Sequence, residues 1–126
     1  MSQIIETADA PAAIGPYVQA RKVGSMLFTS GQIGFDPKTG ALIGDDIESQ
    51  TRQVLANLNA VVRAAGGRRE DIVKTTVFVK DIEHFGRINE IYADFFGDHK
   101  PARSLVEAAR LPKDVLIEIE CIAHIA

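Results

Sequence analysis

The run VLIEIECIA at residues 115–123 alternates with a period of two, and it constrains the fold more than any other part of the chain. One phase consists of Val115, Ile117, Ile119 and Cys121, and the other consists of Leu116, Glu118, Glu120 and Ile122. Successive side chains of a strand point to opposite faces, so a wholly apolar phase requires a packed layer on its face. The run therefore predicts a strand with helices on one face and a half-apolar, half-charged surface on the other.

Further runs have the composition of strands. The run YVQARKVGSMLFTSGQI is split by Gly24-Ser25 and predicts a hairpin with strands at about 17–22 and 26–32. The run DIVKTTVFVKD alternates, with one face formed by Val73, Thr75, Val77 and Val79 and the other by Lys74, Thr76, Phe78 and Lys80. The run SLVEA predicts a strand before the last one, and the turn residues of ARLPKD separate the two.

In two segments, apolar residues recur at helical spacing. The first opens at Asp45 or Asp46, where Glu48 is placed to complete a capping box, and ends before Gly66-Gly67. The second spans about 82–96 and ends before Gly97. Its predicted apolar stripe consists of Phe85, Ile88, Tyr92 and Phe95.

These elements predict one domain over residues 1–126, of the α+β class, with a mostly antiparallel sheet and two helices on one face. The chain has 126 residues, of which 46% are hydrophobic, which is enough for one core and too little for two domains. The outer face of the sheet is too apolar for a monomer to leave in water. We therefore expect the sheets of several copies to associate.

Composition and the absence of common motifs argue against several functions. The net charge of -3 provides no basic field for nucleic acid. The single cysteine, Cys121, lies in an apolar phase and indicates a core residue of a cytoplasmic protein, and no apolar run is long enough to span a membrane. The histidines are scattered, so we expect no metal, and hydride and phosphoryl transfer lose most of their support because no glycine-rich phosphate motif occurs.

Arg103, at the start of the SLVEA strand, is the most promising candidate for a functional residue, together with Glu118 and Glu120. A guanidinium offers paired donors that suit a substrate carboxylate. The same arginine could form a structural ion pair with one of the glutamates across the two strands. Spacing alone favours the ion pair and leaves both interpretations open.

Several motifs occur together in one order over nearly the whole chain. They are IGPYVQA, TSGQIGFDPKTG, AAGG, DIVKTTVFVKD and PARSLVEAARLPKDVLIEIE. In these motifs the chain resembles the reactive-intermediate imine deaminases, the RidA family. The resemblance implies a chorismate-mutase-like fold and a homotrimer with a central barrel and clefts between subunits. It also implies cofactor-free hydrolysis of 2-enamine and 2-imine acids, such as 2-iminobutanoate and 2-iminopropanoate, to 2-oxo acids and ammonia.

The resemblance assigns roles to individual residues. Arg103 matches the arginine that clamps the substrate carboxylate, Glu118 the glutamate that holds the attacking water, and Tyr17 a tyrosine of the same cleft. Three further matches line the cleft or lie near the substrate: Ser30, Gly31 and Asn89.

The chain also departs from the familiar members of the family. Leu105 stands where they carry a cysteine, and Lys100 replaces an aromatic residue in a shortened segment before Arg103. Glu120 is expected to be structural, at a subunit interface. Two other functions remain open: a non-catalytic protein that binds a small carboxylate such as a 2-oxo acid in the same cleft, and an RNA-cleaving or translation-inhibiting protein, which the acidic chain does not favour.

Overall fold

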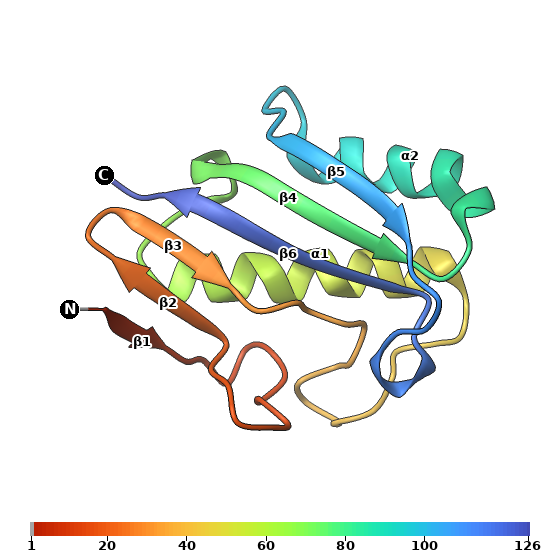
Figure 1. The fold of residues 1–126 in the computed structure, drawn as a ribbon, viewed down its shortest axis with the longest axis horizontal. Helices are drawn as coiled ribbons and strands as arrows, with labels where there is room; N and C mark the ends of the chain where they lie inside the picture. Colours follow the sequence, from red (N-terminus) through yellow and green to blue (C-terminus); the bar gives the residue numbers. More distant parts are fainter. Residues whose placement is uncertain (1) are drawn as a thin grey trace.

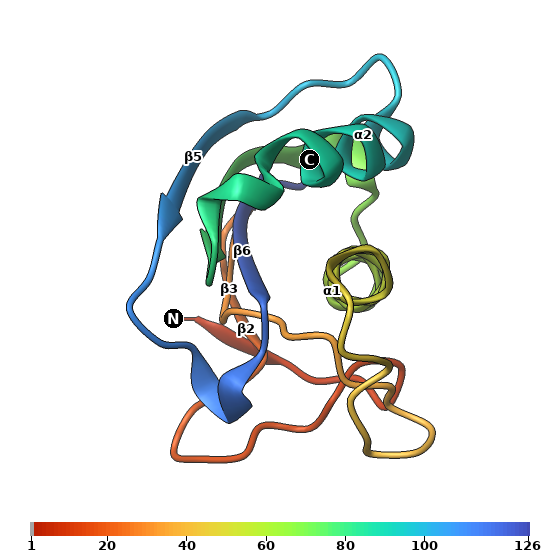
Figure 2. The same cartoon turned by 90° about the vertical axis from the view of Figure 1, so that its right-hand side faces the viewer.

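The computed structural model describes residues 2–126. Within them, six strands form one sheet in the order β1-β2-β3-β6-β4-β5 (Figure 1). The strands are β1 (Gln3–Ile5), β2 (Ala20–Val23), β3 (Met26–Thr29), β4 (Ile72–Val79), β5 (Ala102–Glu107) and β6 (Ile117–His124). The helices α1 (Ile47–Ala64) and α2 (Phe85–Phe96) lie on the same side of the sheet (Figure 2). The predicted α+β class, with two helices on one face, is confirmed.

The last strand of the chain is inserted into the middle of the sheet. β6 runs antiparallel to both β3 and β4. β4 and β5 are parallel, and α2 supplies the crossover that a parallel pair requires. All other neighbouring strands are antiparallel, so the sheet is mixed but mostly antiparallel, as predicted.

Helix α1 begins after Asp46, whose side chain accepts a hydrogen bond of 2.8 Å from the backbone N–H of Ser49. This hydrogen bond lowers the pKa of Asp46. The prediction that Glu48 completes a capping box is wrong, because Ser49 and not Glu48 occupies the third helical position. Glu48 instead lies 3.4 Å from the guanidinium of Arg87 and links α1 to α2.

The predicted faces of β4 are correct except at its start. Thr75, Val77 and Val79 are buried as expected, but Val73 is 43% exposed. The register with β6 shifts between Ile72 and Lys74, so a bulge there reverses the alternation. Ile72 therefore takes the buried position that the sequence pattern assigned to Val73.

The apolar stripe of α2 also differs from the prediction. Its buried residues are Ile88, Ile91 and Phe96. Phe85 is 45% exposed because it lies in the first turn, against the edge strand β5 rather than over the core.

The predicted hairpin is confirmed, with β2 and β3 joined at Gly24 and Ser25. Both strands are shorter than predicted, so Tyr17 and Ser30 lie in loops at their ends. β1 was not predicted, since three residues are too few for a recognisable alternation. Within residues 2–126, neither helix combines the length and the apolar character that crossing a membrane would require.

The face of the sheet away from the helices exposes apolar side chains. Phe28 is 46% and Val106 is 45% exposed, and Ile122 pairs with Phe28 on the same face. Phe78 stands between Glu118 and Val106 in the adjoining strands. This surface, which we call the outer face, agrees with the expectation drawn from the sequence.

The bulge in β4 predicts that two substitutions on this strand differ in their effect on stability. Val77→Ala should lower the free energy of unfolding by about 2 kcal/mol, because Val77 is completely buried. Val73→Ala should cost less than about 0.5 kcal/mol, because Val73 faces water. Urea denaturation of both variants measures the difference, and equal losses would contradict the register of β4.

Candidate active site

Arg103 lies on the edge strand β5 and points to the side of the sheet that carries the helices. It stands level with Thr75 of β4, which is fully buried beneath α2. Its Nη1 donates a hydrogen bond of 2.8 Å to Oδ1 of Asn89 on α2. The guanidinium also lies over two rings, 4.9 Å from the centroid of Tyr92 and 5.6 Å from that of Phe85. These contacts hold the cation without a carboxylate partner.

The ring beneath Arg103 is itself fixed to the sheet. The hydroxyl of Tyr92 lies 2.7 Å from Oγ1 of Thr75, within hydrogen-bonding distance. Burial raises the pKa of Tyr92, although this hydrogen bond and the charge of Arg103 act in the opposite direction. Tyr92 therefore stays neutral and supports the guanidinium through its ring face.

A cavity of about 360 Å³ opens between α2 and the start of β5. Arg103, Asn89 and Tyr92 line it, and Lys100 forms part of its wall. We call this group the arginine half-site. Leu105 follows Arg103 on the same face and packs against the edge of the core.

Glu118 lies on β6 and points to the outer face. Its neighbours Ile117 and Ile119 are fully buried on the helix side, so alternation places Glu118 on the opposite side. A Cβ atom on Gly31 would lie 2.7 Å from the carboxyl carbon of Glu118, so only glycine leaves room for this carboxylate. Burial raises the pKa of Glu118, and the nearby charge of Glu120 raises it further.

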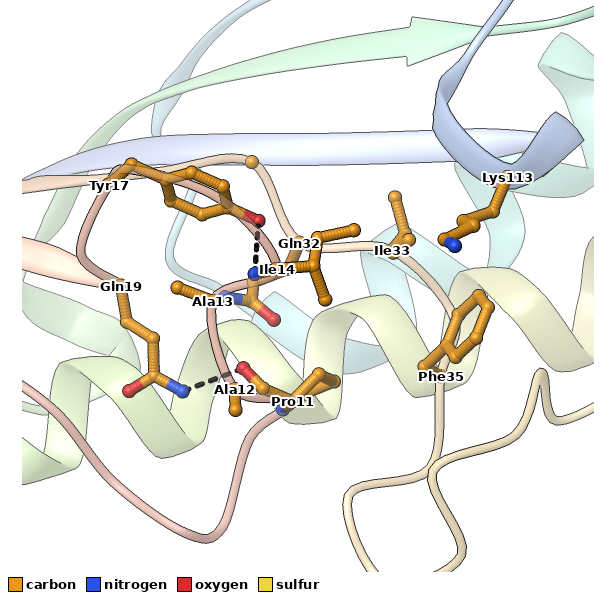
Figure 3. Close-up of a pocket in the computed structure, with 11 residues that line it drawn as sticks. Pro11, Ala12, Ala13, Ile14, Tyr17, Gln19, Gln32, Ile33, Phe35 and Lys113 are labelled. Carbon is orange, nitrogen blue, oxygen red and sulfur yellow. Dashed lines mark hydrogen bonds between the residues drawn. The ribbon is translucent and has the colours of Figure 1, made fainter.

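Tyr17 and Ser30 lie in loops beside Gly31. Oγ of Ser30 donates a hydrogen bond of 2.6 Å to the carbonyl of Val18, so its role in the structure is to join these two loops. The hydroxyl of Tyr17 accepts a hydrogen bond of 3.3 Å from the backbone N–H of Ile14 (Figure 3). Tyr17 is 48% exposed. We call Tyr17, Ser30, Gly31 and Glu118 the glutamate half-site.

Within one chain the two half-sites do not meet. β4 lies between β5 and β6, and Arg103 and Glu118 project from opposite faces of the sheet. The ion pair between Arg103 and a glutamate is therefore wrong, because no such pair forms within residues 2–126. Arg103 and Glu118 therefore do not face each other within one chain.

Cys121 is buried, as predicted, and burial raises the pKa of its thiol to about 12. It therefore remains a neutral core residue at physiological pH. Among residues 2–126, no group of His, Cys, Asp and Glu side chains has the arrangement of a metal site.

Three residues that support the site were not singled out from the sequence as functional. Tyr92 was assigned to the core stripe, although its spacing from Asn89 places both on one side of α2. Gln19 and Asn57 are buried side-chain amides that bind loop backbone, and their long-range partners leave no local pattern. The signal that could have identified such residues is a polar side chain among the apolar positions of a strand or helix.

Residues 7–125 match the family model described as endoribonuclease L-PSP. The chain belongs to this family. A curated relative from Salmonella typhimurium, named 2-iminobutanoate/2-iminopropanoate deaminase, is 60% identical over 126 residues, with 98% of each chain covered.

Solved structures agree with this assignment. Escherichia coli TdcF with bound serine is 52% identical with a TM-score of 0.94, over 98% of this chain and 99% of that one. RidA from an Antarctic Psychrobacter is 43% identical with a TM-score of 0.95, over 98% and 99% of the two chains. The resemblance to the RidA family is confirmed.

The contact between Gly31 and Glu118 predicts a change in ionisation. Gly31→Ala should displace the Glu118 carboxylate into water, because the new Cβ occupies its place. The pKa of Glu118, now raised by burial, should then fall toward the ordinary value of a glutamate. Carbon-13 NMR titration of the Glu118 carboxyl measures this shift. Gly86→Ala is the control, because a Cβ there meets no atom within 4 Å, and it should leave the titration unchanged.

Proposed function

We propose that this protein hydrolyses reactive 2-imino and 2-enamino acids, such as 2-iminobutanoate and 2-iminopropanoate, to 2-oxo acids and ammonia. The observation that carries the proposal is the 60% identity to the Salmonella deaminase over 98% of both chains. The two half-sites support it, because they present a cation without a carboxylate partner and a carboxylate of raised pKa. These are the two groups that binding and hydrolysis of an imino acid require.

A second copy of the chain completes the proposed site. The arginine half-site lies at the sheet edge on the helix side, and the glutamate half-site lies on the outer face, so one chain cannot close both around a small molecule. Packing of outer faces would also bury Phe28, Phe78 and Val106. The resemblance to the RidA family implies that this assembly is a homotrimer with a cleft at each subunit boundary.

Arg103 binds the carboxylate of the substrate. Nη1 of Arg103 donates a hydrogen bond to Asn89, and the guanidinium lies over the ring of Tyr92. This arrangement leaves further N–H donors for a paired contact with the carboxylate. The carboxylate so held fixes C2 of the imine in the cleft. Orientation of this kind accounts for a large part of the acceleration of a reaction that already proceeds in water.

Glu118 holds and activates the water. The water oxygen attacks C2 of the N-protonated imine while the Glu118 carboxylate accepts a proton from the water, giving a carbinolamine. Glu118 then returns this proton to nitrogen, and the bond between C2 and nitrogen breaks as the carboxylate takes up the proton of the carbinolamine hydroxyl. The 2-oxo acid leaves, and the ammonia accepts the last proton from Glu118 and leaves as ammonium. Tyr17 aligns the water through its hydroxyl. A glutamate of raised pKa suits this exchange because it both accepts and returns a proton.

Arg103→Lys should lower kcat/KM for 2-iminobutanoate at least tenfold, because a single ammonium cannot make the paired contact and lacks the planar group that lies over the Tyr92 ring. The imine is generated with a threonine dehydratase, and formation of 2-oxobutanoate is compared with the uncatalysed rate. Arg87→Lys makes the same exchange at the surface of α2, where Arg87 binds Glu90, and should be as active as the parent.

A fully active Arg103→Lys variant would contradict the assigned role. Binding of 2-oxobutanoate that depends on Arg103, without any acceleration of hydrolysis, would instead identify a carboxylate-binding protein. Salt-dependent RNA binding would favour the endoribonuclease description of the family, which the net charge of -3 does not support.

The pH dependence of kcat/KM should report the ionisation of Glu118. Its pKa is raised, so the rate should fall as the pH drops through a value above that of an ordinary glutamate, where the carboxylate takes up a proton. Glu120→Gln removes the neighbouring negative charge, lowers the pKa of Glu118 and should move this acidic limb to lower pH. Profiles of kcat/KM for the parent, Glu120→Gln and the distant control Glu83→Gln measure the shift. An unchanged limb in Glu120→Gln would exclude Glu118 as its source.

A further inference from the structure

A threonine hydroxyl is buried in the sheet beneath helix α2. Thr75 lies in β4 and is completely buried, level with Arg103 on one side and with Cys121 on the other. Among residues 2–126 it is the one buried polar side chain that belongs to a strand. Valine has nearly the same shape and would leave no hydroxyl to satisfy in the core. The polar group at this position therefore needs an explanation.

The partner of this hydroxyl is the hydroxyl of Tyr92, with 2.7 Å between the two oxygens. Valine and phenylalanine in place of these two residues would keep their shapes and remove both polar groups. Such a replacement of both partners of a buried hydrogen bond is nearly neutral for stability, or even stabilising. The stability of the core therefore does not require the pair of hydroxyls.

The pair of hydroxyls instead fixes the ring over which Arg103 lies. The guanidinium carbon of Arg103 is 4.9 Å from the centroid of the Tyr92 ring. Phe96 packs against the same ring, with the centroids 4.7 Å apart, but apolar packing has no preferred direction and does not by itself set the position of the hydroxyl end. The hydrogen bond to Thr75 ties that end to a central strand of the sheet, at the residue paired with Arg103.

Arg103 depends on this support before a substrate binds. None of the ion pairs within residues 2–126 includes Arg103, and its guanidinium donates one hydrogen bond, to Asn89. A long side chain that must be ordered when a ligand binds loses conformational entropy, and this loss weakens binding. A fixed ring lowers the loss, because the guanidinium is already in place when the carboxylate arrives.

We propose that Thr75 is a positioning residue, whose buried hydroxyl acts through Tyr92 to hold the guanidinium of Arg103 ready for the substrate carboxylate. This inference rests on the carboxylate-binding role that the proposed function gives to Arg103. Thr75 is completely buried, so it acts without touching the substrate. The carboxylate contact is made in the ground state as well as in the transition state, so the effect should be seen in Kd and KM more than in kcat.

Thr75→Val should weaken the binding of 2-oxobutanoate about fivefold, because the guanidinium must then be ordered when the carboxylate binds. Isothermal titration calorimetry measures the Kd, and the assay coupled to threonine dehydratase measures KM and kcat for 2-iminobutanoate. KM should rise by about the same factor, and kcat should change less than about twofold. An unchanged Kd in Thr75→Val would overturn the inference.

Thr51→Val is the matched control. Thr51 is also completely buried, and its hydroxyl donates a hydrogen bond of 2.7 Å to the carbonyl of Ile47 within α1. The exchange removes a buried threonine hydroxyl outside the lining of the arginine half-site, so Kd and KM should equal those of the parent. Equal losses of affinity in Thr51→Val and Thr75→Val would mean a general effect of destabilisation and would contradict the positioning role.

Two further variants separate positioning from stability. Thr75→Val combined with Tyr92→Phe leaves no hydroxyl unsatisfied, so its urea midpoint should lie near that of the parent while binding stays weak. Thr75→Ser keeps the hydroxyl and leaves a gap in place of the methyl group. It should therefore unfold at a lower urea concentration and still bind 2-oxobutanoate as tightly as the parent. Affinities that follow the urea midpoints across these variants would overturn the inference.

A double-mutant cycle shows whether Thr75 acts through Arg103. In the Arg103→Lys background the planar guanidinium is gone, so Thr75→Val should change the Kd for 2-oxobutanoate less than about twofold. In the parent background the same exchange should cost about fivefold. A loss of the same size in both backgrounds would show that Thr75 acts independently of Arg103, against the inference.

Failure of the inference and failure of the proposed function give different results. Acceleration of imine hydrolysis by the parent, with equal Kd and KM in the parent and all Thr75 variants, would overturn the positioning role alone. A parent protein that binds 2-oxobutanoate without accelerating hydrolysis would overturn the proposed function, and the Kd values of the variants would still decide the role of Thr75. A parent that does neither would overturn both.

Discussion

The insertion of β6 between β3 and β4 is the constraint on which the rest of the structure depends. Its apolar phase fills the centre of the core, so its other phase must carry Glu118 and Glu120 to the outer face. The same insertion separates β6 from β5 by one strand and fixes which half-site each face supports. A shift of β6 by one residue would bury both carboxylates and expose Ile117 and Ile119. The free energy of the core thus enforces the position of the proposed base.

Loops that regular strands do not hold are fixed by buried amides. Gln19 and Asn57 each bind two or more backbone groups, in the loop before Tyr17 and in the segment after Gly31. Asn89 holds the guanidinium of Arg103 in a similar way, by accepting its hydrogen bond. An amide offers both donors and an acceptor without a net charge, so it can be buried at a lower cost than a carboxylate or a lysine. The arrangement gives the half-sites defined geometry before a substrate arrives, which is the condition for orientation to contribute to rate.

The sequence was sufficient for the class of fold because its strands and helices have clear periods. It failed at Val73 because a bulge is a local property of two paired strands and leaves no trace in the alternation of one. It also failed for the relation between Arg103 and Glu118. Both residues lie near the start of recognisable strands, yet their separation depends on strand order, and β5 and β6 are consecutive in the chain but not neighbours in the sheet. The support of Arg103 by Tyr92 was missed because an aromatic residue on a helix is first interpreted as core.

The exposed apolar residues of the outer face and the divided half-sites have one physical explanation. Phe28, Phe78 and Val106 lose contact with water when outer faces pack together, which supplies a driving force of about 25 cal/mol for each Å² of apolar surface buried. In the proposed assembly the same packing would remove water from around Glu118, which disfavours its charged form. A neighbouring chain would also bring the positive charge of Arg103 to the cleft, which favours the charged form and opposes that effect. The proposed association would therefore complete the cleft and adjust the ionisation of its carboxylate at the same time, so the assembly that removes apolar surface from water would also create the proposed activity.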